Sequence, residues 1–281
     1  MRNDKSLLRT NEKDIKAERA PEISEMATGT SGTYSPSQCL ERKQQEQKRK
    51  TFQEVDWARS DGRNFHQCRP AFLRTGAASV ASGSAYAEFG STKVIVSVFG
   101  PRESKKAMMY SDVGRLNCHV SYTTFSTPIR GQGSDNKEYS SLLHKALEGA
   151  IRLKTFPKTT VDIFALVLES GGGDLPVIIS CASLAIADAG IMMYDLVSAV
   201  SLSCIGKKLV IDPTSEEEAW QDGSLMITYM PSRNEVTQFT LTGEWSTPKI
   251  NEAMELCLDA CSKLADILRL CLKENALELA P

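Results

Sequence analysis

The sequence lacks a charge excess of either sign, because its 33 Lys and Arg residues are balanced by 35 Asp and Glu residues, for a formal net charge of −2. The large positive field of a DNA-coating protein or a polybasic membrane protein is therefore absent, although a local basic patch is not excluded. No apolar segment follows the opening residues, so we expect no secretory signal. The longest apolar stretch, 177–193, contains Asp188 and many small residues, which is typical of a buried helix and not of a membrane span.

Motifs for hydrolysis, nucleotide binding and metal binding are also missing. The only histidines, His66, His119 and His144, do not neighbour a nucleophile elbow or a Cys–His signature. The sequence contains no Walker A loop, no strand-anchored GxGxxG and no CxxC pair. The usual motifs of hydrolases and nucleotide-binding proteins are therefore absent from the sequence. We expect no cofactor and no metal site built on cysteine.

Cysteine itself is plentiful, with eight residues in the chain. Without a secretory signal these predict reduced thiols inside a cell. Cys257, Cys261 and Cys271 fall on the apolar stripe of the last predicted helix, so we expect them in the hydrophobic core.

The chain divides into two parts of different composition. Residues 1–50 hold 11 Lys and Arg against 8 Asp and Glu, a single aromatic residue and a Gly/Ser/Thr/Pro cluster, which predicts a flexible tail with a charge of +3. Residues 51–281 then carry −2 − 3 = −5 and are expected to form the folded part. The run 48–50, Lys-Arg-Lys, is compatible with a nuclear address, with an arm that touches RNA, or with a merely solvated charge cluster.

Hydrophobic periodicity predicts a mixed α/β domain from about residue 70 onward. Alternating or β-branched runs predict strands at 84–89, 92–99, 116–125, 160–168, 196–204, 208–211, 224–230 and 235–242. Spacings of three and four predict helices at 139–151, 174–189 and 250–272. Gly90 and Ser91 predict a hairpin between the first two strands. We expect helices packed on sheet faces and no clean break into two independent domains.

A glycine-rich turn, Ser170-Gly171-Gly172-Gly173-Asp174, connects a predicted buried strand to a predicted buried helix. Backbone N–H groups at such a helix start form a natural phosphate cradle. We expect Asp174 to cap the helix N-terminus itself, so that its carboxylate accepts these N–H groups and repels a second anion.

Two further groups of charged residues follow strand ends. Five carboxylates, Asp212, Glu216, Glu217, Glu218 and Asp222, could hold Mg²⁺, but such runs are mostly exposed, and we favour a surface position. The basic loop residues Arg102, Lys105 and Lys106, followed by Arg115 and Arg130, are equally compatible with contact to an RNA backbone and with plain solvation.

Taken in order, several motifs resemble the ribonuclease PH family over residues 55–272. The motifs that carry the resemblance are Ser60-Asp61-Gly62-Arg63, residues 83–88 (GSAYAE), Thr92-Lys93-Val94, Gly100-Pro101-Arg102-Glu103 and the glycine turn at 171–173. Residues 187–197 and 211–218 are most similar to the non-catalytic ring subunits of the eukaryotic RNA exosome (mRNA-transport-regulator-3 type). The resemblance implies an α/β (α+β mixed), ribosomal protein S5 domain 2-like fold with two related β-rich halves.

Active members of this family cleave RNA from its 3′ end with inorganic phosphate as the nucleophile. The resemblance places their phosphate-gripping residues at Asp174, Leu175 and Asp135, and their carboxylate pair at Asp212 and Glu218. Because negative or apolar groups then stand where phosphate must dock, the resemblance favours a chain with no catalytic residues, in other words no enzyme. An active phosphate-dependent 3′–5′ exoribonuclease is the first alternative, and a free-standing RNA-binding module is the second.

The partners implied by the resemblance are other ring subunits and single-stranded RNA passing through the central pore. We expect a heterodimer with the subunit called ribosomal-RNA-processing protein 42, a cap subunit with an RNA-binding S1 domain above it, and no contact with membranes. The RNA-contacting residues expected in this chain are Arg102, Lys105 and Lys106. The resemblance also implies that the protein is found in the nucleus, the nucleolus and the cytoplasm, where it takes part in ribosomal RNA processing and RNA degradation.

Overall fold

A computed structural model describes residues 57–103, 112–127 and 136–278. Several sequence-based predictions lie outside these residues: the flexible tail at 1–50, the basic run at 48–50, and the roles of Lys105, Lys106, Arg130 and Asp135.

The first sheet has five strands in the order β1-β2-β3-β5-β4. Its strands are β1 (Ala71–Thr75), β2 (Gly83–Phe89), β3 (Thr92–Glu103), β4 (Arg115–Tyr122) and β5 (Thr159–Glu169). All neighbours are antiparallel except β4 and β5, which run parallel. The predicted hairpin at Gly90 and Ser91 is confirmed, since Phe89 pairs with Thr92 across the turn. Alternate side chains of β3 are buried, as the period of two in its sequence predicts.

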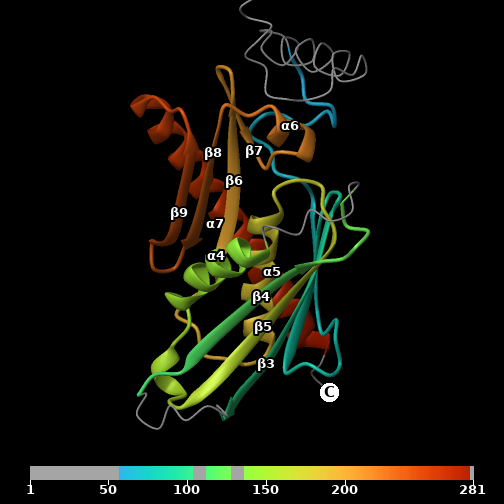
Figure 1. Ribbon diagram of the computed structural model, residues 1–281, viewed down its shortest axis with the longest axis vertical. Coiled ribbons are helices and arrows are strands. Elements are labelled where there is room, and N and C mark those ends of the chain that lie inside the picture. Colours follow the sequence, from blue (N-terminus) through green and yellow to red (C-terminus); the bar gives the residue numbers. More distant parts are fainter. Residues whose placement is uncertain (1–56, 104–111, 128–135, 279–281) are drawn as a thin grey trace, which may run out of the picture. The chain divides into compact units, whose positions relative to one another are not determined.

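The second sheet has four antiparallel strands in the order β7-β6-β8-β9. They are β6 (Ser198–Ile205), β7 (Lys208–Ile211), β8 (Gly223–Met230) and β9 (Glu235–Gly243). The helices are α4 (Asn136–Glu148), α5 (Asp174–Asp188), the short α6 (Ser215–Ala219) and the long α7 (Thr247–Glu278), with a 3₁₀ turn, η1, at Leu153–Thr155 (Figure 1). The mixed α/β class is therefore confirmed, whereas β1 and α6 were not predicted.

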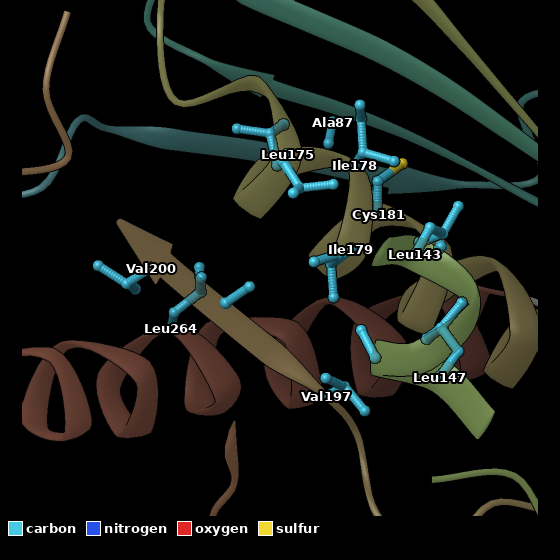
Figure 2. Close-up of a cluster of buried hydrophobic side chains, with 14 of the residues drawn as sticks. Ala87, Leu143, Leu147, Leu175, Ile178, Ile179, Cys181, Val197, Val200 and Leu264 are labelled. Carbon is cyan, nitrogen blue, oxygen red and sulfur yellow. The ribbon is translucent and has the colours of Figure 1, made fainter. Parts of the chain in front are cut away.

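Helix α5 lies between the two sheets and is buried on all sides from Leu175 to Ile186. It contacts β2 and β3 of the first sheet and β6 of the second, with α4 and α7 alongside. In Figure 2, Ile178 lies next to Ala87 of β2, while Ile179 points away from that sheet, to the side where β6 and α7 lie. One hydrophobic cluster thus joins both sheets, which explains why the apolar stretch that begins at Val177 is a core helix.

The predicted core positions of the cysteines in α7 are confirmed. Cys257 and Cys261 have no exposed surface, and Cys271 is also buried. No helix within the described ranges has the length and apolar character needed to cross a membrane.

Candidate functional site at the glycine turn

The glycine turn lies between β5 and α5, where the sequence predicted it. Gly172 and Gly173 adopt left-handed backbone angles, with φ of +96° and +60°. A side chain on Gly172 would also collide with the backbone of the 213–215 segment, since a Cβ there would lie 2.9 Å from the Pro213 carbonyl oxygen. Both reasons require glycine at this position.

The prediction that Asp174 caps the helix is wrong. The N-cap residue is Gly173, and Asp174 is the first residue of α5. The carboxylate of Asp174 turns aside and accepts hydrogen bonds from Ser170 Oγ at 2.6 Å and Tyr122 Oη at 3.1 Å. Burial raises the pKa of this carboxyl above its ordinary value. The hydrogen bonds from the two hydroxyl groups act in the opposite direction and favour the ionised form.

Asp212 and Arg69 form a buried bidentate ion pair beside the turn. Arg69 Nε donates to Asp212 Oδ2 at 2.9 Å, and Nη2 donates to Oδ1 at 2.7 Å. The backbone N–H of Arg69 also donates to Oδ2, at 2.8 Å. Arg69 Nη2 further donates to the Gly172 carbonyl oxygen at 2.8 Å, so one guanidinium ties Asp212 to the glycine turn.

Helix α6 brings Glu218 to the same place. The Ser215 N–H donates to the Gly171 carbonyl oxygen at 3.0 Å, and the Gly173 N–H donates to Glu218 Oε1 at 2.9 Å. Burial is the largest influence on this carboxyl, and it raises the pKa of Glu218 to about 7. The side chain thus changes its protonation state near neutral pH.

The prediction that the acidic run lies on the surface is wrong for Asp212 and Glu217, and Glu218 is half-buried. Asp212 is only 7% exposed and Glu217 only 1%. Glu217 forms a bidentate pair with Arg59, at 2.9 and 2.8 Å, and Glu218 sits against the turn as described. Buried arginines that are distant in sequence compensate these charges, which no local pattern of acidic residues reveals. Among the described residues, no group of three or more His, Cys, Asp or Glu side chains is arranged to hold a metal ion.

The other predicted site residues lie elsewhere. Arg102 is at the end of β3 and pairs with Asp162 of β5, with 65% of its side chain exposed. Leu175 is 8% exposed and packs in the hydrophobic core, so its side chain offers nothing to an anion.

Three further residues lie at this site and were not predicted. Arg69 is paired with Asp212 as described, Arg63 Nη1 lies 3.7 Å from Asp212 Oδ2, and the Ser201 carbonyl oxygen accepts the Asp212 N–H at 2.9 Å. The buried Oγ of Ser201 has no hydrogen-bond partner within the described part of the chain. Arg63 stood in a quoted motif, but Arg69 and Ser201 carried no signal. The cluster combines a carboxyl that titrates near neutral pH with two guanidinium groups, which is suited to proton transfer beside a bound anion.

Comparison with known proteins identifies the family. Residues 67–192 match the family described as "3′ exoribonuclease family, domain 1", and residues 195–260 match "domain 2" of the same family. The two matches meet between α5 and β6, so the domains of the family correspond to the two sheets.

Relatives of known name share much of the chain. A protein of Arabidopsis thaliana named "Exosome complex component RRP41-like" is 75% identical over 223 residues, covering 79% of this chain and 87% of its own. "Exosome complex component Rrp41" of Pyrococcus furiosus is 35% identical over 226 residues, covering 79% and 90%. Among solved structures, rice Rrp46 superposes with a TM-score of 0.67 at 24% identity, over 75% of this chain and 98% of that one. A chain of an Archaeoglobus fulgidus exosome with RNA bound to the active site superposes with a TM-score of 0.69 at 21% identity, over 79% of this chain and 97% of that one. At these identities both structures show the fold alone.

These findings correct two predictions. The similar relatives carry Rrp41 names, so the assignment to the mRNA-transport-regulator-3 type is not confirmed. The prediction that the chain is not an enzyme is wrong, because those relatives and the description of the matched family point to an exoribonuclease. The prediction failed physically because it placed the Asp174 carboxylate at the helix start, whereas that side chain turns aside to Ser170 and Tyr122 and leaves the N-cap position to Gly173. The chain belongs to the 3′ exoribonuclease family, also called the ribonuclease PH family.

Proposed function

We propose that this chain is an Rrp41-like subunit of an exosome ring and takes part in phosphate-dependent removal of nucleotides from the 3′ end of RNA. The names of its relatives and the family description support the ring and the substrate class. The observation that carries the proposal is Glu218, a carboxyl with a pKa of about 7 that is anchored to the glycine turn by the Gly173 N–H.

The proposed reaction requires one proton transfer. An oxygen of inorganic phosphate attacks the last phosphodiester phosphorus, the bond from phosphorus to the 3′ oxygen of the preceding nucleotide breaks, and a nucleoside diphosphate leaves. The 3′ oxygen must gain a proton, and protonated Glu218 is suited to donate it because its pKa lies near the working pH. Asp212 is unsuited to that role, since its two oxygens already accept three hydrogen bonds from Arg69.

Phosphate binding then depends on groups other than the side chain of Leu175, which is apolar and buried. We propose Arg63 as one partner: its guanidinium lies beside Asp212, which Arg69 already pairs, and phosphate would replace the exposed carboxylate of Asp61, to which Arg63 Nε donates at 2.6 Å. Ring neighbours are expected to contribute further cationic groups. Pairing with the ribosomal-RNA-processing protein 42 subunit, an S1-domain cap and the nuclear, nucleolar and cytoplasmic locations stay predictions.

The test uses the full chain, alone and assembled with its co-purifying ring partners. Single-stranded RNA labelled at its 5′ end is incubated with and without inorganic phosphate, and nucleoside diphosphates are quantified. We expect release that requires phosphate, a fall in rate above about pH 7 as Glu218 loses its proton, and a loss of at least about a hundredfold in E218Q. The matched control is E216Q, which removes an exposed carboxylate from the same helix and should leave the rate unchanged.

Two results would contradict the proposal. One is an assembled ring that shortens RNA without any dependence on phosphate. The other is an E218Q ring that retains the wild-type rate and pH profile.

A further inference from the structure

Strand β4 forms one edge of the first sheet, with β5 as its only neighbouring strand among the described residues. The direction of its peptide groups follows from two hydrogen bonds. The Thr123 N–H, just after the strand, donates to the Val167 carbonyl oxygen of β5 at 3.0 Å. The Val120 N–H points the other way and donates to Ser140 Oγ of α4 at 2.9 Å. In a parallel ladder the peptide groups of successive residues point to opposite sides of the strand. The N–H and C=O groups of the even-numbered residues of β4 therefore point away from β5, toward the open edge.

The two ends of this outer edge are already occupied. Val120 is bonded to Ser140, and the Gly114 N–H donates to the Leu153 carbonyl oxygen at 2.8 Å. Between them lie the outward-facing peptide groups of Leu116 and Cys118, for which no hydrogen-bond partner occurs within residues 57–103, 112–127 and 136–278. A gap of two peptide groups, spaced like a strand, therefore remains open on the edge.

A groove of about 610 Å³ lies over this gap, between β4 and α4, which run beside each other in Figure 1. A smaller cavity of about 230 Å³ adjoins it at Arg115 and Leu116. The polar side chains that line the groove include Arg115, His119, His144 and Lys145, against the single carboxylate Glu148. His144 Nδ1 lies 3.7 Å from that carboxylate. Arg115 and Lys145 together outweigh the one carboxylate, so the groove carries a net positive charge. We call this feature the β4 groove.

We propose that the β4 groove binds an extended acidic peptide segment of another protein, which pairs with Leu116 and Cys118 as an additional strand. Open N–H and C=O groups at strand spacing select a polypeptide backbone, because strand addition depends on main-chain hydrogen bonds. Arg115 and Lys145 at the rim select acidic side chains by charge complementarity. Nucleic acid would use the cations but leave the two peptide groups unpaired. The proposal does not depend on the proposed exoribonuclease function.

The test uses the full chain and a fluorescein-labelled peptide of about eight alternating valine and glutamate residues, a length that spans the edge at strand rise. Fluorescence anisotropy is expected to show saturable binding, and hydrogen exchange of the complex is expected to show new protection at the amides of Leu116 and Cys118. The same peptide with methylated backbone nitrogens should bind at least tenfold more weakly. A short oligouridylate of equal charge should not displace it.

Variants separate the two contributions. R115E and K145E should each weaken binding at least fivefold, whereas K273E, which makes the same charge change on exposed α7, should not. C118P removes one outward N–H at an edge position that tolerates proline and should abolish binding while circular dichroism stays unchanged. Since C118P could disturb the strand, the charge variants provide the independent test. The proposal is overturned if the peptide does not bind, if oligouridylate displaces it, or if the amides of Leu116 and Cys118 are already protected in the free chain.

Discussion

Burial decides the chemistry of the individual carboxylates at the glycine turn. Asp212 is held by the fork of Arg69, which donates to both of its oxygens, while Glu218 accepts one backbone N–H and has a pKa of about 7. The two neighbouring acids therefore differ in their hydrogen-bond donors. Asp212 is fixed in position by its arginine, whereas Glu218 is able to exchange a proton near neutral pH.

The raised pKa of Glu218 predicts a pH-dependent stability. The folded state holds the Glu218 proton with a pKa of about 7, against 4.5 ordinarily, so the stabilisation from that proton is full below about pH 4.5 and is lost as the pH rises through 7. E218Q carries no such proton. The difference in free energy of unfolding, E218Q minus wild type, should therefore rise by up to about 3 kcal/mol between pH 4.5 and pH 8. Urea unfolding at both pH values measures this, and a constant difference between the two proteins would contradict it.

Removing one partner of the Arg69–Asp212 pair should be costly, because the other charge is then buried alone. We expect R69M to lower the free energy of unfolding by about 3–5 kcal/mol. The double variant R69M/D212N should recover part of that loss, since the unpaired charge is gone. Chemical denaturation of the wild type and both variants checks the prediction. A double variant less stable than R69M would show that the pair does more than compensate charge.

At the scale of elements, β2 packs closely against the end of α5 at Gly83. A Cβ on Gly83 would lie 2.6 Å from the Ala185 carbonyl oxygen, and backbone cannot move aside as a flexible side chain does. G83A should therefore destabilise the protein by about 2–3 kcal/mol. The matched control is G149A, where the nearest atom is 3.8 Å away and φ is not in the left-handed region, so stability should change by less than about 1 kcal/mol. Thermal unfolding distinguishes the two.

The elements that the sequence predicted well are those with a long, regular period. The β2–β3 hairpin and α7 repeat their apolar spacing over enough residues for the buried face to be evident. By contrast, β1 is five residues long with Phe72 57% exposed, and α6 is five residues of mostly acidic sequence. Such short elements are stabilised by the structure around them and carry no period of their own.

The site was predictable in position but not in electrostatics. Asp212 and Glu218 lie together, as the family resemblance implied. Arg69, which pairs with Asp212, is 143 residues away in sequence. The direction taken by the Asp174 side chain depends on Tyr122, 52 residues before it. Contacts across such separations form only once the chain is folded. The orientation of Asp174, on which the prediction of an inactive chain rested, therefore could not be derived from the local sequence.

At the scale of the whole folded part, the two halves that the family divides are interlocked. Helix α5 belongs to the first half, yet it packs on β6 of the second. Helix α7 belongs to the second half, yet it contacts β1, where Cys271 Sγ lies 3.5 Å from the Leu73 carbonyl oxygen. Each half therefore covers apolar surface of the other, and the shared cluster makes one cooperative unit.

This interlocking predicts that neither half folds alone. A fragment 57–192 would expose the face of α5 on which Ile179 lies, and a fragment 195–281 would expose the apolar face of β6 that α5 covers. We expect both fragments to lack a cooperative thermal transition, whereas the full chain unfolds in one step, coincident by near-UV and far-UV circular dichroism. Mixing the fragments should restore some structure, because the complementary surfaces remain available.

A point mutation in the shared core tests the same interlocking in the full chain. I179A leaves one cavity between the halves, and it should lower the free energy of unfolding by about 2–4 kcal/mol without splitting the transition. Two separate transitions in that variant, or an independently folded first half, would mean that the sheets are autonomous and only touch at α5.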